Sequence, residues 1–168
     1  MSASGTLTIP AGAVSGAVDV IVNGDVTYEG NEILSLTLSN PADATVSDGI
    51  AEGTIVNNDK MSTILTLKVV RKPRAVIAKG LLEPTKSGHR VTATLYRKQG
   101  TRFVKISSKT VPVRYIKDRD GDGKKDGTYT ATFNRPKAQG SYEVLVRFKG
   151  TGTHRPCSRS AVFTLPAS

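Results

Sequence analysis

The 168-residue sequence lacks tryptophan, has one cysteine and contains few aromatic residues. The single thiol, Cys157, excludes an intrachain disulfide, so the fold must be held by packing and hydrogen bonds. No apolar run has the length that a membrane span needs, and the N-terminus lacks the basic and apolar regions of a secretion signal. We therefore expect a soluble chain without a membrane span that is a piece of a longer protein.

Groups of residues typical of catalysis are also missing from the sequence. His89 and His154 stand alone, and there is no Cys/His cluster with metal-ligand spacing, no nucleophile elbow and no phosphate-binding glycine loop. His154 is near Cys157, but the proline between them favours a surface loop over a reactive thiolate pair. The sequence thus offers no catalytic residue, and we expect that the protein is not an enzyme.

Charge divides the chain into two parts. Residues 1–60 contain one basic and eight acidic residues, a net charge of −7, whereas residues 61–168 contain 23 basic and six acidic residues, a net charge of +17. Such a reversal is typical of two modules with different surfaces. We therefore predict a boundary near Asp59 to Met61.

Apolar and polar residues alternate with a period of two throughout, which predicts an all-β protein. In residues 1–60 the pattern indicates about four strands, which is roughly half of a seven-stranded sandwich. The inward positions of these strands would be Leu7, Ile9, Val18, Val20, Val22, Leu34, Leu36, Leu38 and Ile55. Because half a sandwich leaves its inner face open, we expect docking on the second module, dimerisation or a partner chain to cover it.

Residues 61–168 predict a complete antiparallel β-sandwich of the Ig-like kind. Strand patterns occur near 63–70, 74–83, 89–98, 102–114, 127–134, 141–149 and 160–165. The expected core is Val91, Ala93, Leu95, Tyr129, Ala131, Phe133, Tyr142, Val144, Val146 and Phe148. A segment of this size can fold alone.

The motifs "GTLTIPAG", "NGD…E…NE", "LTLSNP…A" and "GTIVNND" within residues 4–59 resemble the C-terminal half of a Calx-beta domain. The resemblance implies an extracellular or membrane-associated calcium-binding sandwich whose first half is absent here. Its acidic loop corresponds to Asp25, Glu29 and Glu32, and its closing run to Asn57, Asn58 and Asp59. We therefore consider Asp25, Glu29, Glu32 and Asp59 a second metal candidate. The alternative is a solvated acidic loop.

The stretch "GTYTATFNRPKAQGSYEVLVRFKGTGTHRPCSRSAVFTL" resembles the Ig-like repeats of bacterial, often actinobacterial, cell-surface proteins. Cys157 replaces a residue that is usually small and polar in those repeats. The resemblance implies an architectural or adhesive spacer and supplies no catalytic residue.

The loop "DRDGDGKKDG" carries the strongest metal-binding pattern. Side chains of Asp118, Asp120, Asp122 and Asp126, with the backbone carbonyl of Lys124, match the first part of an EF-hand calcium loop. The last position, where a bidentate glutamate is expected, is Tyr129, and the flanks are strands. The pattern is similar to the calcium loops of dockerins and thrombospondin type 3 repeats. We expect a calcium loop of non-EF type, with a charge-balanced polar hairpin as the alternative.

These patterns together predict a structural or adhesive module of a bacterial extracellular surface protein. In this prediction calcium stiffens the loops, and the partners are neighbouring β-sandwich modules of a longer chain. The dispersed positive charge of residues 61–168 suggests an alternative. It would suit a polyanion-binding module whose ligand is a cell-wall polymer, an acidic polysaccharide or extracellular DNA.

Overall fold

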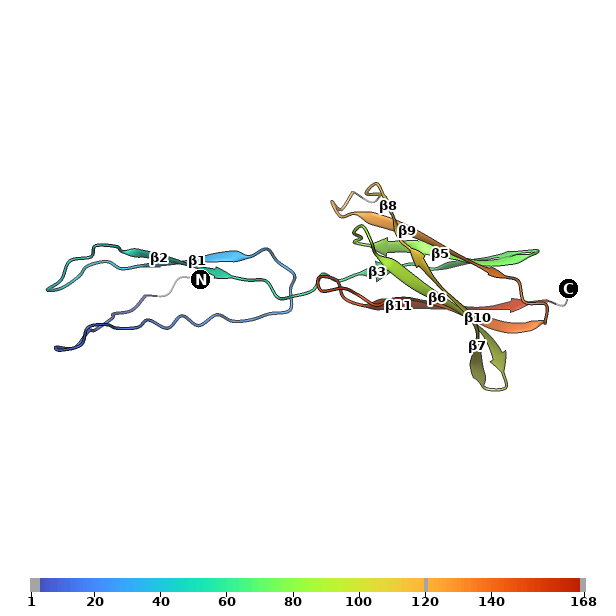
Figure 1. Cartoon of the computed structure of the whole chain (residues 1–168), viewed down its shortest axis with the longest axis horizontal. Helices are drawn as coiled ribbons and strands as arrows, with labels where there is room; N and C mark the ends of the chain where they lie inside the picture. The colour runs from blue at the N-terminus through green and yellow to red at the C-terminus, as the bar shows by residue number, and fades with distance from the viewer. Residues whose placement is uncertain (1–3, 120, 167–168) are drawn as a thin grey trace.

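The computed structural model describes residues 4–119 and 121–166, and these residues form an all-β structure. They contain no helix that is long and apolar enough to cross a membrane. An N-terminal segment, residues 4–59, and a C-terminal sandwich, residues 61–166, lie end to end (Figure 1). The N-terminal segment contains one antiparallel pair, β1 (Glu32–Thr37) and β2 (Ile50–Ile55).

The C-terminal part is an antiparallel β-sandwich, as the sequence predicts. One sheet has the order β11-β10-β6-β7, and the other has the order β3-β5-β9-β8, with β4 also paired to β5. The strands are β3 (Ile64–Leu65), β4 (Lys68–Lys72), β5 (Ala75–Glu83), β6 (Arg90–Gln99), β7 (Arg102–Pro112), β8 (Arg114–Ile116), β9 (Asp126–Asn134), β10 (Gly140–Phe148) and β11 (Cys157–Leu165).

Two expected strands are each divided in the structure. The stretch 102–114 breaks at Val113, so that β7 pairs with β6 in one sheet and β8 pairs with β9 in the other. Val113 is buried at this corner, and its N–H donates to the carbonyl of His89 at 2.8 Å. Burying a valine where the chain changes sheets closes one side of the sandwich core. The stretch 63–70 likewise divides into β3 and β4, which both pair with β5.

The core of the sandwich is the one that the alternation predicts. All ten expected core residues are buried, and Leu65, Val76, Ala78, Leu82, Val113 and Leu165 join them. Tyr129 reaches from β9 to the carbonyl of Thr66, to which its hydroxyl donates a hydrogen bond. Burial raises the pKa of Tyr129, so the phenol keeps the proton that it donates.

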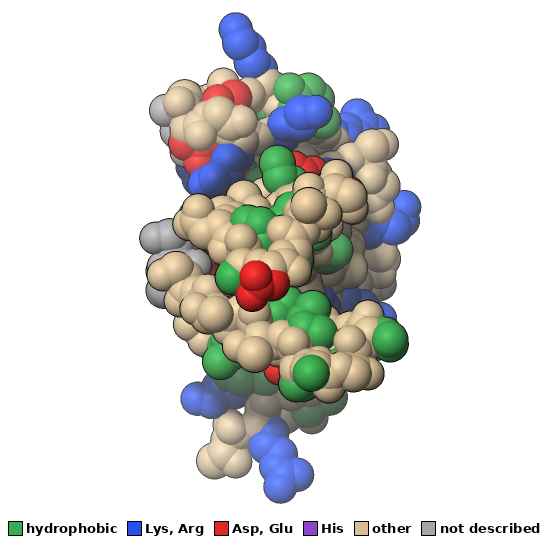
Figure 2. All heavy atoms as spheres, turned by 90° about the vertical axis from the view of Figure 1, so that its left-hand side faces the viewer, with side chains coloured by type: hydrophobic (Ala, Val, Ile, Leu, Met, Phe, Trp, Pro, Cys, Tyr) green, Lys and Arg blue, Asp and Glu red, His purple; other side chains and the backbone are tan. Residues whose placement is uncertain are grey.

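The N-terminal segment differs from the expected half sandwich. Two of the four expected strands form, whereas residues 4–31 turn back at Pro10–Ala13 without a hydrogen-bonded ladder in the described part. Expected inward residues such as Leu7, Ile9 and Val22 remain 38%, 53% and 51% exposed. Without a second layer of strands the apolar faces have nothing to pack against. An isolated two-stranded hairpin is only marginally stable in water. Figure 2 shows hydrophobic side chains gathered at this end of the molecule.

Met61, the first residue of the sandwich part, is held by backbone hydrogen bonds, and Arg155 beside it reaches the N-terminal segment. The N–H of Met61 donates to the carbonyl of Thr153, and its carbonyl accepts the N–H of Arg155, both at 2.9 Å. The guanidinium of Arg155 donates to the carbonyl of Val26 at 2.8 Å. The N-terminal segment otherwise extends away from the sandwich (Figure 1), so its apolar face is not covered by docking on the second module.

Candidate functional site

The aspartate-rich loop connects β8 to β9, and Asp118 organises its turn. One carboxylate oxygen of Asp118 accepts the N–H of Gly121 at 2.8 Å, and the other accepts the N–H of Gly123 at 2.9 Å. Both glycines have φ near +80°, a conformation that is costly for residues with a Cβ. Asp118 therefore needs no metal to hold the loop in a turn.

Asp122 is bound to a lysine of the same loop. Its Oδ1 accepts the N–H of Lys124, and its Oδ2 forms an ion pair with the Lys124 ammonium, both at 2.8 Å. Its carboxyl group also interacts with that of Glu83. Lys124 is the main reason that the pKa of Asp122 lies below its usual value. Part of the loop's negative charge is thus balanced within the chain, as the polar-hairpin alternative requires.

Asp126 differs from the other loop aspartates because it is buried. Only 2% of the residue is exposed, and its Oδ2 accepts the N–H of Arg119 at 3.0 Å. Its Oδ1 is buried and has no hydrogen-bond partner in the structure. A buried carboxylate oxygen without a donor is costly, so this atom indicates a missing donor or cation.

The five predicted calcium ligands do not appear as a complete site. Asp120 lies outside the described residues. Among residues 4–119 and 121–166, no three His, Cys, Asp or Glu side chains converge as metal ligands. Glu83, at the end of β5, is the acidic neighbour that the sequence analysis missed. The pairing of β5 with β9 brings it to the loop, and no loop pattern contains that information.

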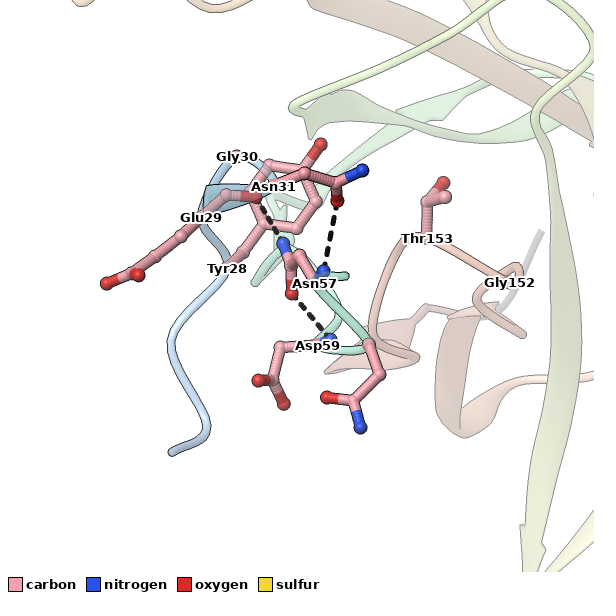
Figure 3. A pocket seen from close by; sticks show the side chains of 9 residues that line it. Tyr28, Glu29, Gly30, Asn31, Asn57, Asp59, Gly152 and Thr153 are labelled. Atoms are coloured by element: carbon pink, nitrogen blue, oxygen red, sulfur yellow. Dashed lines mark hydrogen bonds between the residues drawn. The ribbon is translucent and has the colours of Figure 1, made fainter. Parts of the chain in front are cut away.

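Two members of the second predicted metal set, Glu29 and Asp59, lie at a hollow at the junction. The hollow has a volume of about 340 Å³ and is lined by Tyr28, Glu29, Gly30, Asn31, Asn57, Asn58, Asp59, Gly152 and Thr153. Asp25 and Glu32 are not in its lining, and the carboxylate of Glu29 points away from Asp59 (Figure 3). The structure therefore does not bring the four acids into one cluster.

Asn57 instead links the chain before β1 to the chain after β2 at this hollow (Figure 3). Its N–H donates to Asn31 Oδ1 at 3.0 Å, and its side-chain Nδ2 donates to the carbonyl of Glu29. Its Oδ1 accepts the N–H of Asp59 at 2.7 Å. An amide at this position serves as a hydrogen-bonding link, which a carboxylate could not fully replace because it has no donor.

Basic residues face each other on the outer surface of β4 and β5. Lys68 is directly opposite Lys79 in the strand register, and both residues are exposed. Like charges at directly opposite positions destabilise an antiparallel pair. A bound anion would relieve this repulsion, so the pair is a specific candidate for polyanion contact.

The two histidines are not isolated, which corrects the expectation from the sequence. The rings of His89 and His154 pack edge to face, with centroids 4.7 Å apart, and Phe148 contacts His89. His154 is fully buried, so the predicted surface loop was wrong for this residue. Cys157 is half-buried at the start of β11, with Thr63 Oγ1 at 3.1 Å from its sulfur. Nothing in the sequence marks the two rings as neighbours, because the residue before β6 and the 150–155 loop meet through tertiary packing.

No family model matches the chain, and no curated protein matches it. The chain is similar to a solved structure, wild type OgpA from Akkermansia muciniphila, with 8% sequence identity and a TM-score of 0.41. The match covers 64% of this chain and 30% of that chain. A likeness at this level carries no argument about activity, so the function has to follow from the chain's own residues.

Proposed function

We propose that the protein is a non-enzymatic structural or adhesive module of a bacterial extracellular surface protein, in which calcium stiffens the loop 117–125. The observation that carries the proposal is the end-to-end arrangement of the two parts (Figure 1), with the Arg155 guanidinium bonded across the junction to the carbonyl of Val26. A hydrogen bond across a short junction limits bending more than an unattached flexible linker does. Such an arrangement suits a spacer that holds other modules at a distance.

The partners in this proposal are neighbouring β-sandwich modules of a longer chain. The resemblance of residues 127–165 to Ig-like surface repeats supports an extracellular location. Millimolar calcium outside cells would fill sites of about 10⁻⁴ to 10⁻³ M affinity, which is the range of extracellular modules. The buried, unpartnered Oδ1 of Asp126 supports a cation at the loop.

Small-angle X-ray scattering of the whole chain tests the spacer. We expect the scattering of an elongated particle in which the N-terminal segment extends from the sandwich, and Gly substitutions at Asn58 and Lys60 should make it more flexible. A profile that fits a compact particle, with the N-terminal segment folded over the sandwich, would contradict the proposal.

A second candidate function, binding to a polyanion, is favoured by the Lys68–Lys79 pair on β4 and β5. Heparin chromatography with a salt gradient tests it, since phosphate- or sulfate-rich polymers release counterions on binding. Lys68→Gln with Lys79→Gln should elute at lower salt than Lys98→Gln with Lys137→Gln, which removes the same charge elsewhere. Equal elution of the two double variants would mean that retention reflects net charge alone.

A further inference from the structure

The outer face of the sheet that contains β4, β5 and β9 carries a row of basic and hydroxyl side chains across the strands. Lys68 on β4 is opposite Lys79 on β5, and Lys79 is opposite Thr130 on β9. Side chains alternate along a strand, and the neighbours Ala78 and Tyr129 are buried in the core. Lys68, Lys79 and Thr130 therefore point outward, and all three are exposed.

Arg114 continues this row on β8. It is opposite Thr128, and it follows the buried Val113, so its side chain lies on the outer face, where it is exposed. None of Lys68, Lys79 and Arg114 forms an ion pair with a carboxylate of the described residues. The positive charges of this row are thus left for a ligand to neutralise.

A hollow lies beside Arg114 because β8 is short. This strand pairs with β9 only from Asp126 to Thr128, and the chain before it belongs to the other sheet. The space beside β9 has a volume of about 440 Å³ and is lined by Val111, Pro112, Arg114, Thr128, Tyr129 and Thr130. A guanidinium and two threonines therefore border one hollow at the end of the basic row.

The backbone of β9 is open toward this hollow. The N–H of Arg135 donates to the carbonyl of Arg74 on the β5 side, so the alternating positions Thr132 and Thr130 turn their backbone groups to the other side. The Lys109 ammonium reaches the Thr132 carbonyl from that side, at 2.5 Å. No strand of the described residues pairs with Thr130 there. Its N–H and carbonyl can therefore bond to a ligand.

We propose that this surface binds an acidic polysaccharide, whose anionic groups contact Lys68, Lys79 and Arg114. A sugar hydroxyl in the hollow bonds to Thr130. This inference rests on the polyanion binding proposed above, and it adds to that function a ligand class, a third basic residue and the hollow.

The side chains of the surface favour a polysaccharide over a nucleic acid. Proteins hold single-stranded nucleic acids largely by stacking bases on aromatic rings, and none of the outward residues of β4, β5 and β9 is aromatic. Duplex DNA is read by a helix or a narrow ribbon that enters its groove, whereas these cations lie on the face of a sheet. A polysaccharide carries anionic and hydroxyl groups along one chain, which matches a row of cations and threonines.

Calorimetric titration of the whole chain with heparin at several salt concentrations tests the proposal. Arg114→Gln should weaken binding and reduce the slope of log affinity against log salt by about 1, as the loss of one ionic contact does. The matched control is Arg102→Gln, which removes the same charge at the start of β7 in the other sheet. The control should keep the wild-type slope.

Thr130→Val separates the hydroxyl contact from the charge. It should weaken heparin binding about two- to tenfold, which is the contribution of one hydrogen bond, and leave the salt slope unchanged. Its control is Thr164→Val, at an exposed position of β11 in the other sheet. Binding to duplex DNA should not respond to Thr130→Val. Because Arg114 and Thr130 are exposed, both variants should keep the wild-type melting temperature.

The outcomes separate this inference from the function on which it rests. If heparin does not bind the wild-type chain, both fail. If Lys68→Gln with Lys79→Gln weakens binding while Arg114→Gln and Thr130→Val match their controls, polyanion binding stands and the inference is wrong. An effect of only one of these two single substitutions would also overturn it, because it requires both contacts. If Thr130→Val weakens DNA binding as much as heparin binding, the ligand class is wrong.

Discussion

The imidazole rings of His89 and His154 pack edge to face inside the sandwich, with their centroids 4.7 Å apart. The Nδ1 of His89 accepts the backbone N–H of Lys86 at 3.1 Å, which requires this nitrogen to be unprotonated. The Nδ1 of His154 lies 2.9 Å from Thr153 Oγ1, and its Nε2 is buried without a partner. The pair is thus built for the neutral form, and His154 belongs to the loop that binds Met61.

Acidification through the histidine range is expected to destabilise the sandwich. Burial, and then the charge of Lys86, hold the pKa of His89 below its usual 6.5, and burial together with the charges of His89 and Lys86 lowers that of His154. The stability that they contribute is complete above about pH 6.5 and is lost as pH falls toward the folded-state pKa values. Thermal melts between pH 7.5 and 5.5 measure this decline.

A double variant isolates the histidine contribution. His89→Gln with His154→Gln cannot gain protons in this range, so its melting temperature should change much less between pH 7.5 and 5.5. Carboxyl groups titrate mostly below this range and remain in the variant as an internal control. An equally steep decline in the double variant would show that other groups cause the pH dependence.

Gly80 is required by the close approach of β5 to Thr66. A Cβ on this glycine would lie 2.0 Å from the Thr66 carbonyl oxygen and 2.8 Å from the Tyr129 hydroxyl. Gly80→Ala should therefore lower the free energy of unfolding by about 3 kcal/mol, the upper part of the usual overpacking range. Gly53→Ala in β2, where a Cβ would meet nothing within 4 Å, is the control and should change little in chemical denaturation.

The sandwich was predictable from the sequence because its strands are buried on one face. Period-two alternation places Val91, Tyr129 and Val144 inward, and all three are buried. The division of 102–114 at Val113 was not predictable, because the alternation continues through the corner while hydrogen bonding changes sheets. Local pattern specifies which face a residue occupies and leaves the choice of partner strand to tertiary packing.

The candidate site was predictable only where its residues are adjacent in sequence. The turn made by Asp118, Gly121 and Gly123 follows the loop pattern. The contact between Glu83 and Asp122 depends on strand pairing across the sheet, as does the packing of the two histidines. In the N-terminal segment the pattern predicted inward positions, but the structure leaves them unburied because burial also requires a second layer of strands.

Residues 61–168 alone should fold cooperatively, whereas residues 1–60 alone should not. The buried core lies entirely within Leu65 to Leu165, and none of the described residues from 4 to 59 is buried. Two-state denaturation of the C-terminal fragment, with a midpoint close to that of the whole chain, is the expected result. A sharp unfolding transition for the isolated first 60 residues would contradict it.

Lys124 is expected to oppose calcium binding, since its ammonium occupies Asp122 Oδ2 at 2.8 Å. Lys124→Ala should raise the calcium affinity, and Asp122→Ala should abolish the response. At free calcium about 100 times the dissociation constant, binding would stabilise the wild-type chain by about 2.7 kcal/mol. Melting curves at low ionic strength measure the shift, with Lys137→Ala as the charge-matched control. If millimolar calcium does not shift the melting temperature, the loop is only a polar turn.

The apolar face of the N-terminal segment should make the chain associate into dimers. Val18, Val20 and Val22 are inward positions predicted from the sequence, and they remain about half exposed, between 45% and 51%. Exposed apolar strands with open edges are association surfaces. Light scattering over a range of protein concentrations should therefore show a monomer–dimer equilibrium that persists in about 0.5 M salt, where surface charge attraction is screened.

Two aspartate substitutions locate the dimer surface. Val20→Asp places a charge among the inward positions and should shift the equilibrium to monomer. Ile21→Asp, at a neighbouring position that is 89% exposed on the other side of the stretch, should leave it unchanged. Equal effects of the two substitutions would mean that association does not use the inward face. A wild-type chain that stays monomeric at all concentrations would rule out dimerisation through this segment.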